Sequence, residues 1–271
     1  MTESESALTV TKREGYEIWT MQLAPVNAIN PELLTELRAA IAAASADPEV
    51  SAVVLASSLR VFSAGADAAW MAAMVQENGT GGLLEAFNTT MDDFREVCME
   101  IRRMPALVIA ALDGHVVAGG LELAAACDLR FCAANDKIQL SVPEMDLFGA
   151  MPTGGGGAQF LTRLCGASRA LDLILDAKPV NPGRALTVGL VDRLIDDGTA
   201  QEAAERFAAE VARKAGRIGV HAAKRSVHIG SELPLEAALA FDQSVHWDAM
   251  RRGNFIPGVE AFVAKYGVSR S

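Results

Sequence analysis

Glycine-rich turns and a nearby carboxylate give this chain the means for chemistry at an acyl group. The apolar run 106–112 predicts a buried strand and 121–127 predicts a helix, so Gly119 and Gly120 fall at a strand-to-helix turn. The first N–H groups of a helix have no partner within it and stabilise an anion placed over them. Glu122, one turn into this helix, reaches the same neighbourhood. Taken alone, the segment is equally consistent with tight helix packing and a carboxylate that complements the helix dipole.

A second turn of small residues follows the strand-like run 52–56. Gly65 permits backbone angles that other residues avoid, and its neighbours Ala64 and Ala66 leave the backbone amides accessible. Together with Gly119, this turn offers N–H donors from two separate loops. Such a pair of donors favours a site for an oxyanion.

The elements that must position these turns follow a strand, strand, helix order and end in a helical tail. Asn30 and Pro31 indicate a helix start, with a cap residue followed by proline at the first helical position. No sequence repeat, low-complexity tract or linker interrupts the chain. Strands are expected at 8–12, 16–23, 51–56, 106–112, 129–133 and 137–140, and helices at 31–44, 83–103, 121–126, 158–165, 168–176, 203–215, 221–230 and 235–252.

Six segments, in order, resemble the enoyl-CoA hydratase/isomerase family, also called the crotonase family. The resemblance implies an α/β fold with a β-β-α spiral core. The core, with its acyl-CoA site, spans 1–199, and a C-terminal helical region used in trimerisation spans 200–271. The matching segments are 25–29, 62–67, 114–128, 143–144, 152–157 and 185–192.

The resemblance implies hydration of a 2-enoyl-CoA thioester through an enolate held by two amides. The donors are the amides of Ala66 and Gly119, and removing such a donor costs on the order of 100- to 1000-fold in rate. Glu122 and Glu144 supply the acid and the base, and the apolar neighbours of Glu144 favour its protonated form. Which glutamate acts as the base stays open. Gly154 matches the backbone position that helps to hold the water.

The same resemblance implies residues that bind the substrate and its coenzyme A portion. The lysine that usually follows the small-residue turn is replaced by Ala69, so the contacts to the coenzyme phosphates stay open. Basic pairs at 224–225 and 251–252 are further candidates for these contacts. The substrate-binding residues are expected to be Ala64, Ala66, Asp67, Ala68, Gly119 and, from the tail, Lys265.

Two other functions stay open beside hydration. Related double-bond isomerases keep one glutamate, so the pair Glu122 and Glu144 favours a hydratase over a Δ3-Δ2-enoyl-CoA isomerase. Dienoyl isomerases carry an aspartate where this chain has Pro152. A catalytically silent binding subunit is the remaining alternative, and the intact glutamate pair argues against it.

Composition excludes several classes of protein. The chain has 271 residues, is 51% hydrophobic and has a formal net charge of −10, which argues against nucleic-acid binding. Its acidic N-terminus has no features of a signal peptide, and its apolar runs are shorter than the about 20 residues that span a membrane. We therefore expect a cytoplasmic protein, and the family resemblance implies an enzyme of fatty acid metabolism. The cysteines form no Cys-x-x-Cys pair, the histidines share no ligand spacing, and the glycine run lacks a P-loop ending. No metal and no cofactor are expected, with coenzyme A present only as part of the substrate.

The tail predicts a homotrimer or a dimer of trimers. Residues 233–247 offer more apolar surface than a terminal appendage can hide against its own core, and large exposed apolar patches usually mark interfaces. The stoichiometry comes from the family resemblance. Further along, Phe255, Ile256 and Phe262 are expected to anchor the chain end, with Lys265 near a neighbouring subunit's site.

Overall fold

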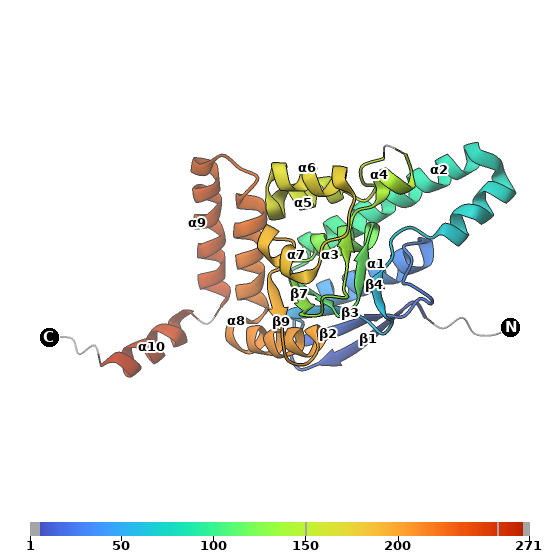
Figure 1. Cartoon of the computed structure of the whole chain (residues 1–271). Coiled ribbons are helices and arrows are strands. Elements are labelled where there is room, and N and C mark those ends of the chain that lie inside the picture. Colours follow the sequence, from blue (N-terminus) through green and yellow to red (C-terminus); the bar gives the residue numbers. More distant parts are fainter. Residues whose placement is uncertain (1–5, 150, 254, 268–271) are drawn as a thin grey trace.

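The computed structural model describes residues 6–149, 151–253 and 255–267. Two sheets and the helices around them form the main body, and the last two helices extend from it as an arm (Figure 1). No helix in these ranges is both long enough and apolar enough to span a bilayer.

The larger sheet has six strands in the order β1-β2-β3-β5-β7-β9. Its first two strands form an antiparallel pair, and all the others run parallel to their neighbours. The strands are β1 (Leu8–Arg13), β2 (Tyr16–Met21), β3 (Ala52–Ser57), β5 (Leu107–Leu112), β7 (Leu129–Ala133) and β9 (Arg193–Ile195).

The smaller sheet positions the two turns of small residues. It pairs β4 (Val61–Ser63), β6 (His115–Val117) and β8 (Leu140–Ser141) in parallel. Each of β3, β5 and β7 is followed by one of these strands and then by a helix, so the predicted strand, strand, helix order is confirmed. Because β4 and β6 are parallel neighbours, the turns that follow them lie at the same edge of the sheet.

Both faces of the larger sheet are buried, which explains its nearly continuous apolar strands. Val53, Leu55 and Val108 face the main core. Ala52, Val54 and Ile109 alternate with them and face the other side. The first half of a long helix from the tail covers that second face through Ala200, Ala204 and Ala208.

The helices begin and end largely where local signals place them. The Asn30 side chain accepts a hydrogen bond from the Leu33 N–H at 3.0 Å, as its cap position predicts. The helices are α1 (Pro31–Ala46), α2 (Ala68–Arg103), α3 (Gly119–Ala126), α4 (Glu144–Leu147), α5 (Gly157–Cys165), α6 (Ala167–Asp176), α7 (Pro182–Val188), α8 (Ala200–Gly230), α9 (Leu235–Arg252) and α10 (Phe255–Tyr266).

Three sequence expectations need correction. Helix α2 begins at Ala68, not near residue 83, because a helix with a kink at Gly79, where φ is 69°, continues through the glycine cluster. The two helices expected at 203–215 and 221–230 form one element, α8, kinked at Gly216. The strand expected at 137–140 is wrong in its bounds, since the smaller sheet pairs only Leu140–Ser141 there. The sequence also missed short elements whose patterns are too brief to detect: β4, β6, β9, α4 and α7.

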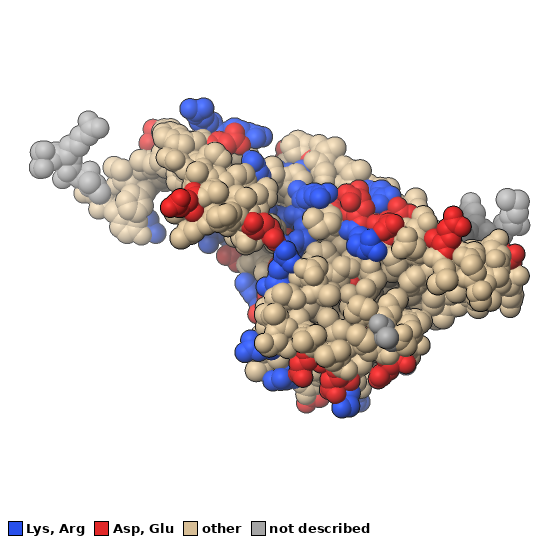
Figure 2. Space-filling view, turned by 90° about the horizontal axis from the view of Figure 1, so that it is seen from above, with Lys and Arg blue, Asp and Glu red and all other residues tan. Residues whose placement is uncertain are grey.

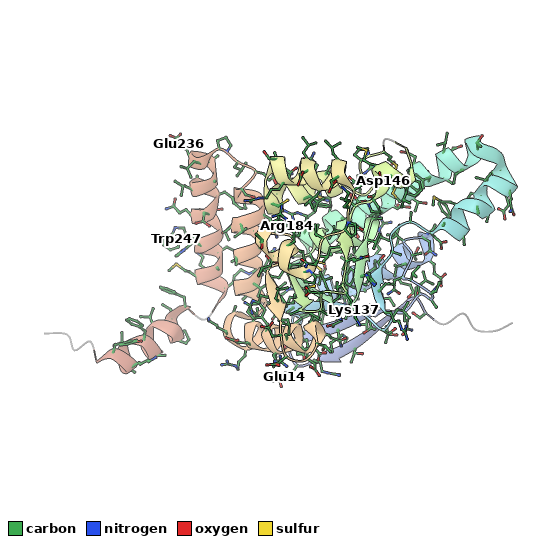
Figure 3. The ribbon with its side chains drawn as sticks, in the orientation of Figure 1. Glu14, Lys137, Asp146, Arg184, Glu236 and Trp247 are labelled. Carbon is green, nitrogen blue, oxygen red and sulfur yellow. The ribbon has the colours of Figure 1, made fainter. Side chains whose placement is uncertain are left out.

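The C-terminal region has two different environments. The first half of α8 packs on the sheet, whereas α10 contains no buried residue. Trp247 on α9 points away from the main body (Figure 3), with 52% of its surface exposed. The proposed division at residues 199 and 200 stays a prediction.

Candidate active site

The two turns of small residues touch each other. Gly65 has φ of +85°, and a Cβ at this position would lie 2.6 Å from the Ala118 Cβ and 2.8 Å from the Gly119 nitrogen. Only glycine tolerates both this backbone conformation and this close approach. The sequence therefore brings the amides that follow each strand to the same place.

Two backbone amides at this contact are free to bind an oxyanion. Gly119 is the first residue of α3, so its N–H has no partner within the helix. Ile29 bridges to Ala66, but its N–H donates to the Gly65 carbonyl and leaves the Ala66 N–H unused. Among the described residues, neither the Ala66 nor the Gly119 N–H has an acceptor. Both residues line a common cavity.

Glu122 is a buried carboxylate held by the N-terminus of another helix. Its Oε2 accepts a hydrogen bond from the Gly157 N–H at 2.6 Å, and Oε1 accepts a longer one from the Gly154 N–H at 3.4 Å. Gly157 begins α5, so the helix dipole also favours the negative charge. Burial raises the pKa of Glu122, while the N–H groups of Gly157, Gly154 and Gly155 oppose this rise. These amides stabilise its ionised form.

Glu144 is buried like Glu122 but has fewer hydrogen bonds to its carboxylate. It is the first residue of α4 and is only 3% exposed. Its Oε2 atom has no hydrogen-bond partner among the described residues. Burial raises the pKa of Glu144 to about 7; its own backbone N–H opposes this rise and the charge of Glu122 adds to it. A substantial fraction of Glu144 is therefore protonated at neutral pH.

A small cavity brings these groups together. Its volume is about 20 Å³, enough for a single water molecule, which needs at least roughly 10–15 Å³. An acyl chain can enter only when the apolar side chains around it move. The polar groups at its wall come from Ala66, Gly119, Glu122, Glu144 and Gly154, and the apolar walls from Ile29, Phe87, Met91, Phe94, Phe148 and Met151.

The other predicted binding residues lie outside this cavity. The Ala64 N–H donates to the Val26 carbonyl, and Ala68 is exposed at the start of α2. The Asp67 carboxylate caps α2 through the Trp70 N–H at 2.9 Å, which is a structural role. Lys265 lies on α10, which extends away from the main body and its cavity (Figure 1).

Two residues of the site were not predicted from the sequence. Gly157 provides the shorter hydrogen bond to Glu122, and its membership of the glycine run was the only available signal. Arg95 of α2 donates to the Gly154 carbonyl at 3.1 Å and lowers the pKa of Glu122 through its charge. The spacing of Arg95 in the sequence does not indicate this contact, because Arg95 lies 59 residues from Gly154.

The profile of the enoyl-CoA hydratase/isomerase family matches residues 14–268. The chain belongs to this family. Its structure is a crotonase fold, and the fold and family predicted from the sequence are both confirmed.

The chain is also similar in sequence to two enzymes of other organisms. The chain is 31% identical over 243 residues to a mitochondrial methylglutaconyl-CoA hydratase of Mus musculus, an alignment that covers 88% of this chain and 74% of the relative. It is 34% identical over 199 residues to a fatty acid oxidation complex subunit alpha of Shewanella halifaxensis, which covers 72% of this chain and 27% of that protein.

Solved structures agree with this assignment. A crystal structure of an enoyl-CoA hydratase from Geobacillus kaustophilus has a TM-score of 0.86 and 31% identity, and the match covers 97% of this chain and 95% of the other. The structure of Pseudomonas aeruginosa DspI has a TM-score of 0.85 and 29% identity, with 98% of both chains covered. These likenesses place the protein among enzymes of acyl-CoA metabolism.

Proposed function

We propose that this protein is an enoyl-CoA hydratase, a lyase that adds water across the 2,3 double bond of a 2-enoyl-CoA thioester. The observation that carries the proposal is the placement of two buried glutamates, of which only Glu122 is held by backbone amides, on one cavity with two free amides. Hydration needs a base for the water, an acid for the α-carbon and donors for the enolate oxygen. Each requirement has a candidate group at this cavity.

The amides of Ala66 and Gly119 stabilise the intermediate. When water attacks the β-carbon, the electron pair of the double bond moves toward the thioester and places negative charge on its oxygen. Donors that are already oriented stabilise this charge without reorganising, which is the source of most oxyanion-hole catalysis. The start of α3 adds the positive end of a helix dipole at Gly119.

The environments of the glutamates support a different role for each. Ionised Glu122 accepts a proton from the attacking water, and the water oxygen forms the new bond to the β-carbon. Protonated Glu144 gives its proton to the α-carbon, and the enolate charge returns to the thioester carbonyl. The proton gained by Glu122 and the proton lost by Glu144 are then re-exchanged with solvent, which restores both groups.

The walls of the cavity favour an uncharged, apolar acyl group. Ile29, Phe87 and Met91 supply apolar surface, and the charged groups lining the cavity are the two glutamates themselves. A second carboxylate on the substrate would meet negative charge and no cationic partner there. We therefore expect better turnover of crotonyl-CoA than of a 2-enoyl-CoA whose acyl chain ends in a carboxylate.

One observation favours isomerisation as a second candidate function. A glutamate with a pKa near 7, such as Glu144, is able to take a proton from one carbon and return it to another. A Δ3-Δ2-enoyl-CoA isomerase would use Glu144 in this way and would not require Glu122 as a base. A silent binding subunit, in contrast, would have no use for the perturbed pKa of Glu144.

A spectrophotometric assay separates the three functions. A hydratase consumes the conjugated absorbance of crotonyl-CoA, whereas an isomerase creates such absorbance from a 3-enoyl-CoA. A silent subunit does neither. Loss of absorbance with crotonyl-CoA supports the proposal, and its persistence at high enzyme concentration contradicts it.

We further propose a homotrimer or a dimer of trimers that works without a metal or redox cofactor. The arm exposes Leu235, Leu239 and Phe262 to 74%, 61% and 59%. Burying this surface against another copy would remove it from water, and it would bring Lys265 to a neighbouring coenzyme. The exposed apolar surface supports the assembly, and the family supplies the stoichiometry.

A further inference from the structure

A second, larger cavity lies between the end of α2, the helix α5 and the second half of α8. Its volume is about 590 Å³, in the range of small-molecule sites, and it shares no lining residue with the catalytic cavity. From above, Lys and Arg side chains gather between the arm and the main body (Figure 2), although the protein as a whole is acidic. The side chains that define this second cavity are the apolar Met99, Phe160 and Leu233 and the basic Arg102, Arg163 and Arg225.

Arg102 is fixed in place by two contacts. Its guanidinium lies 5.6 Å from the centre of the Phe160 ring and donates from Nη2 to the Nδ1 atom of His228 at 3.1 Å. The Nε2 atom of His228 lies 2.7 Å from Asp128 Oδ1. A guanidinium has no lone pair to offer, so Arg102 must be the donor and Nδ1 the acceptor. The ring proton of His228 is therefore on Nε2, which donates it to Asp128 Oδ1. The guanidinium is therefore oriented before any ligand arrives.

The nearby carboxylates are already committed to other groups. Asp128 binds the Lys224 ammonium at 2.8 Å and the Val108 N–H at 2.7 Å. Glu232 forms a forked pair with Arg163, with distances of 2.7 and 2.9 Å. Neither carboxylate is left to neutralise a further cation.

Two guanidinium groups at the cavity consequently lack an acidic partner in the part of the chain that the structure describes. Within the described ranges, no carboxylate oxygen lies within 4.0 Å of a nitrogen of Arg102 or Arg225. Arg225 instead lies 5.3 Å from the centre of the Phe241 ring. Burial lowers the pKa of His221, which also lines the cavity, and the charge of Arg225 lowers it further. The cavity is thus a local region of positive charge in a protein of net charge −10.

We propose that this cavity is a binding site for an organic anion, distinct from the catalytic site. Arg102 and Arg225 bind a carboxylate or phosphate head group, and Met99, Phe160 and Leu233 contact a short apolar body. A planar guanidinium matches both kinds of head group through paired N–H donors. The inference is independent of the proposed hydratase activity, because it uses none of the catalytic residues.

Calorimetry on the full-length protein tests the site with three probes of equal chain length. Octanoate and octyl phosphate carry the two candidate head groups, and octanol carries the same body without charge. We expect at least one of the anions to bind more tightly than octanol, and the tighter of the two identifies the head group. Equal binding of all three, or no binding of either anion, contradicts the proposal.

Substitutions locate the bound anion. Arg102→Gln and Arg225→Gln should each weaken its binding by about 10- to 100-fold, the cost of losing a charged hydrogen bond. The matched control is Arg206→Gln. Arg206 is an exposed arginine in the first half of α8, the helix that also carries Arg225, and it lies outside the cavity. It should bind the anion as the wild type does. Equal affinity in all three variants assigns the binding elsewhere and overturns the proposal.

Two further measurements separate a ligand site from a structural role. Light scattering should give the same oligomeric state for Arg225→Gln as for the wild type. Dissociation of Arg225→Gln would show that the cavity is a subunit contact and would overturn the proposal. Arg102→Lys keeps the positive charge but loses the paired N–H donors of the guanidinium. This variant should bind the anion more tightly than Arg102→Gln.

Discussion

The N–H of Gly157 lies 2.6 Å from Oε2 of Glu122, and a Cβ at Gly157 would lie 2.6 Å from the Cγ of that glutamate. The glycine therefore both orients the carboxylate and provides the room it occupies. The N-terminus of α5 thus orients a carboxylate that belongs to α3. This relationship makes the position of Glu122 sensitive to a single methyl group.

Gly157→Ala should impair hydration while keeping the fold. The added methyl group displaces the Glu122 carboxylate, and a misplacement of about 1 Å can cost on the order of 100-fold in rate. The control is Gly183→Ala in α7, where the new Cβ would meet only the Asn181 side chain at 3.7 Å. Steady-state kinetics with crotonyl-CoA measures the effect, and wild-type kcat in Gly157→Ala would contradict the positioning role.

Glu122→Gln and Glu144→Gln should each lower kcat for hydration by about 100- to 10,000-fold, because each keeps its volume and loses its acid–base capacity. The control is Asp146→Asn on the exposed side of α4 (Figure 3), which should retain full activity. Near-native turnover in both glutamate variants would refute the two-carboxylate mechanism. If only Glu144→Gln is inactive toward a 3-enoyl-CoA, the isomerase alternative gains support.

Isotope exchange tests the separate role of each glutamate. With butyryl-CoA in deuterated water, exchange at the α-carbon needs the enolate and Glu144 but no attack by water. Glu122→Gln should therefore retain exchange while losing hydration, and Glu144→Gln should lose both. The reverse pattern, followed by proton NMR, would exchange the assigned roles.

The pH dependence of hydration follows from the raised pKa of Glu144. An acid must be protonated to act, so kcat/KM should be highest below pH 7 and fall as the pH rises through about 7. The same shift affects stability. The unfolded chain loses this proton near its ordinary pKa of 4.5, while the folded protein keeps it to about 7, so the stabilising contribution is lost across that window. Urea unfolding should show this loss in the wild type and not in Glu144→Gln.

Gly119→Pro should suppress every activity that passes through an enolate. Proline has no N–H and is compatible with the first position of a helix, so it removes the donor at α3 directly. We expect a loss on the order of 100-fold or more in both hydration and α-carbon exchange. A folded variant, confirmed by circular dichroism, that exchanges at the wild-type rate would exclude this amide as a donor.

Removing α9 and α10 should dissociate the assembly. A chain that ends at Leu233 keeps the half of α8 that covers the sheet, whereas a chain that ends near residue 200 would uncover Ile109 and Phe131. Light scattering should find a trimer or hexamer for the intact protein and monomers for the shortened one. Lys265→Gln should keep the oligomer and raise KM for crotonyl-CoA. A monomeric intact protein would contradict the assembly.

The sequence by itself determined the local elements and the family. The apolar runs at 52–56 and 106–112 predicted buried strands, and Asn30 followed by Pro31 predicted a helix start. The signals were strong there because the interactions are short-range: a cap bonds within three residues, and a buried strand shows its environment in its own composition.

Tertiary structure alone decided the chemistry of the site. Glu122 and Gly157 are 35 residues apart, and no local pattern shows that the N-terminus of one helix stabilises a carboxylate on another. The same is true of the buried Oε2 of Glu144, which has no partner among the described residues, and of the contact between Arg102 and His228, 126 residues apart. A pKa depends on desolvation and on neighbouring charges, and both are fixed only when distant segments pack together. The sequence therefore named candidate catalytic groups, and the packing set their burial and hydrogen-bond environments.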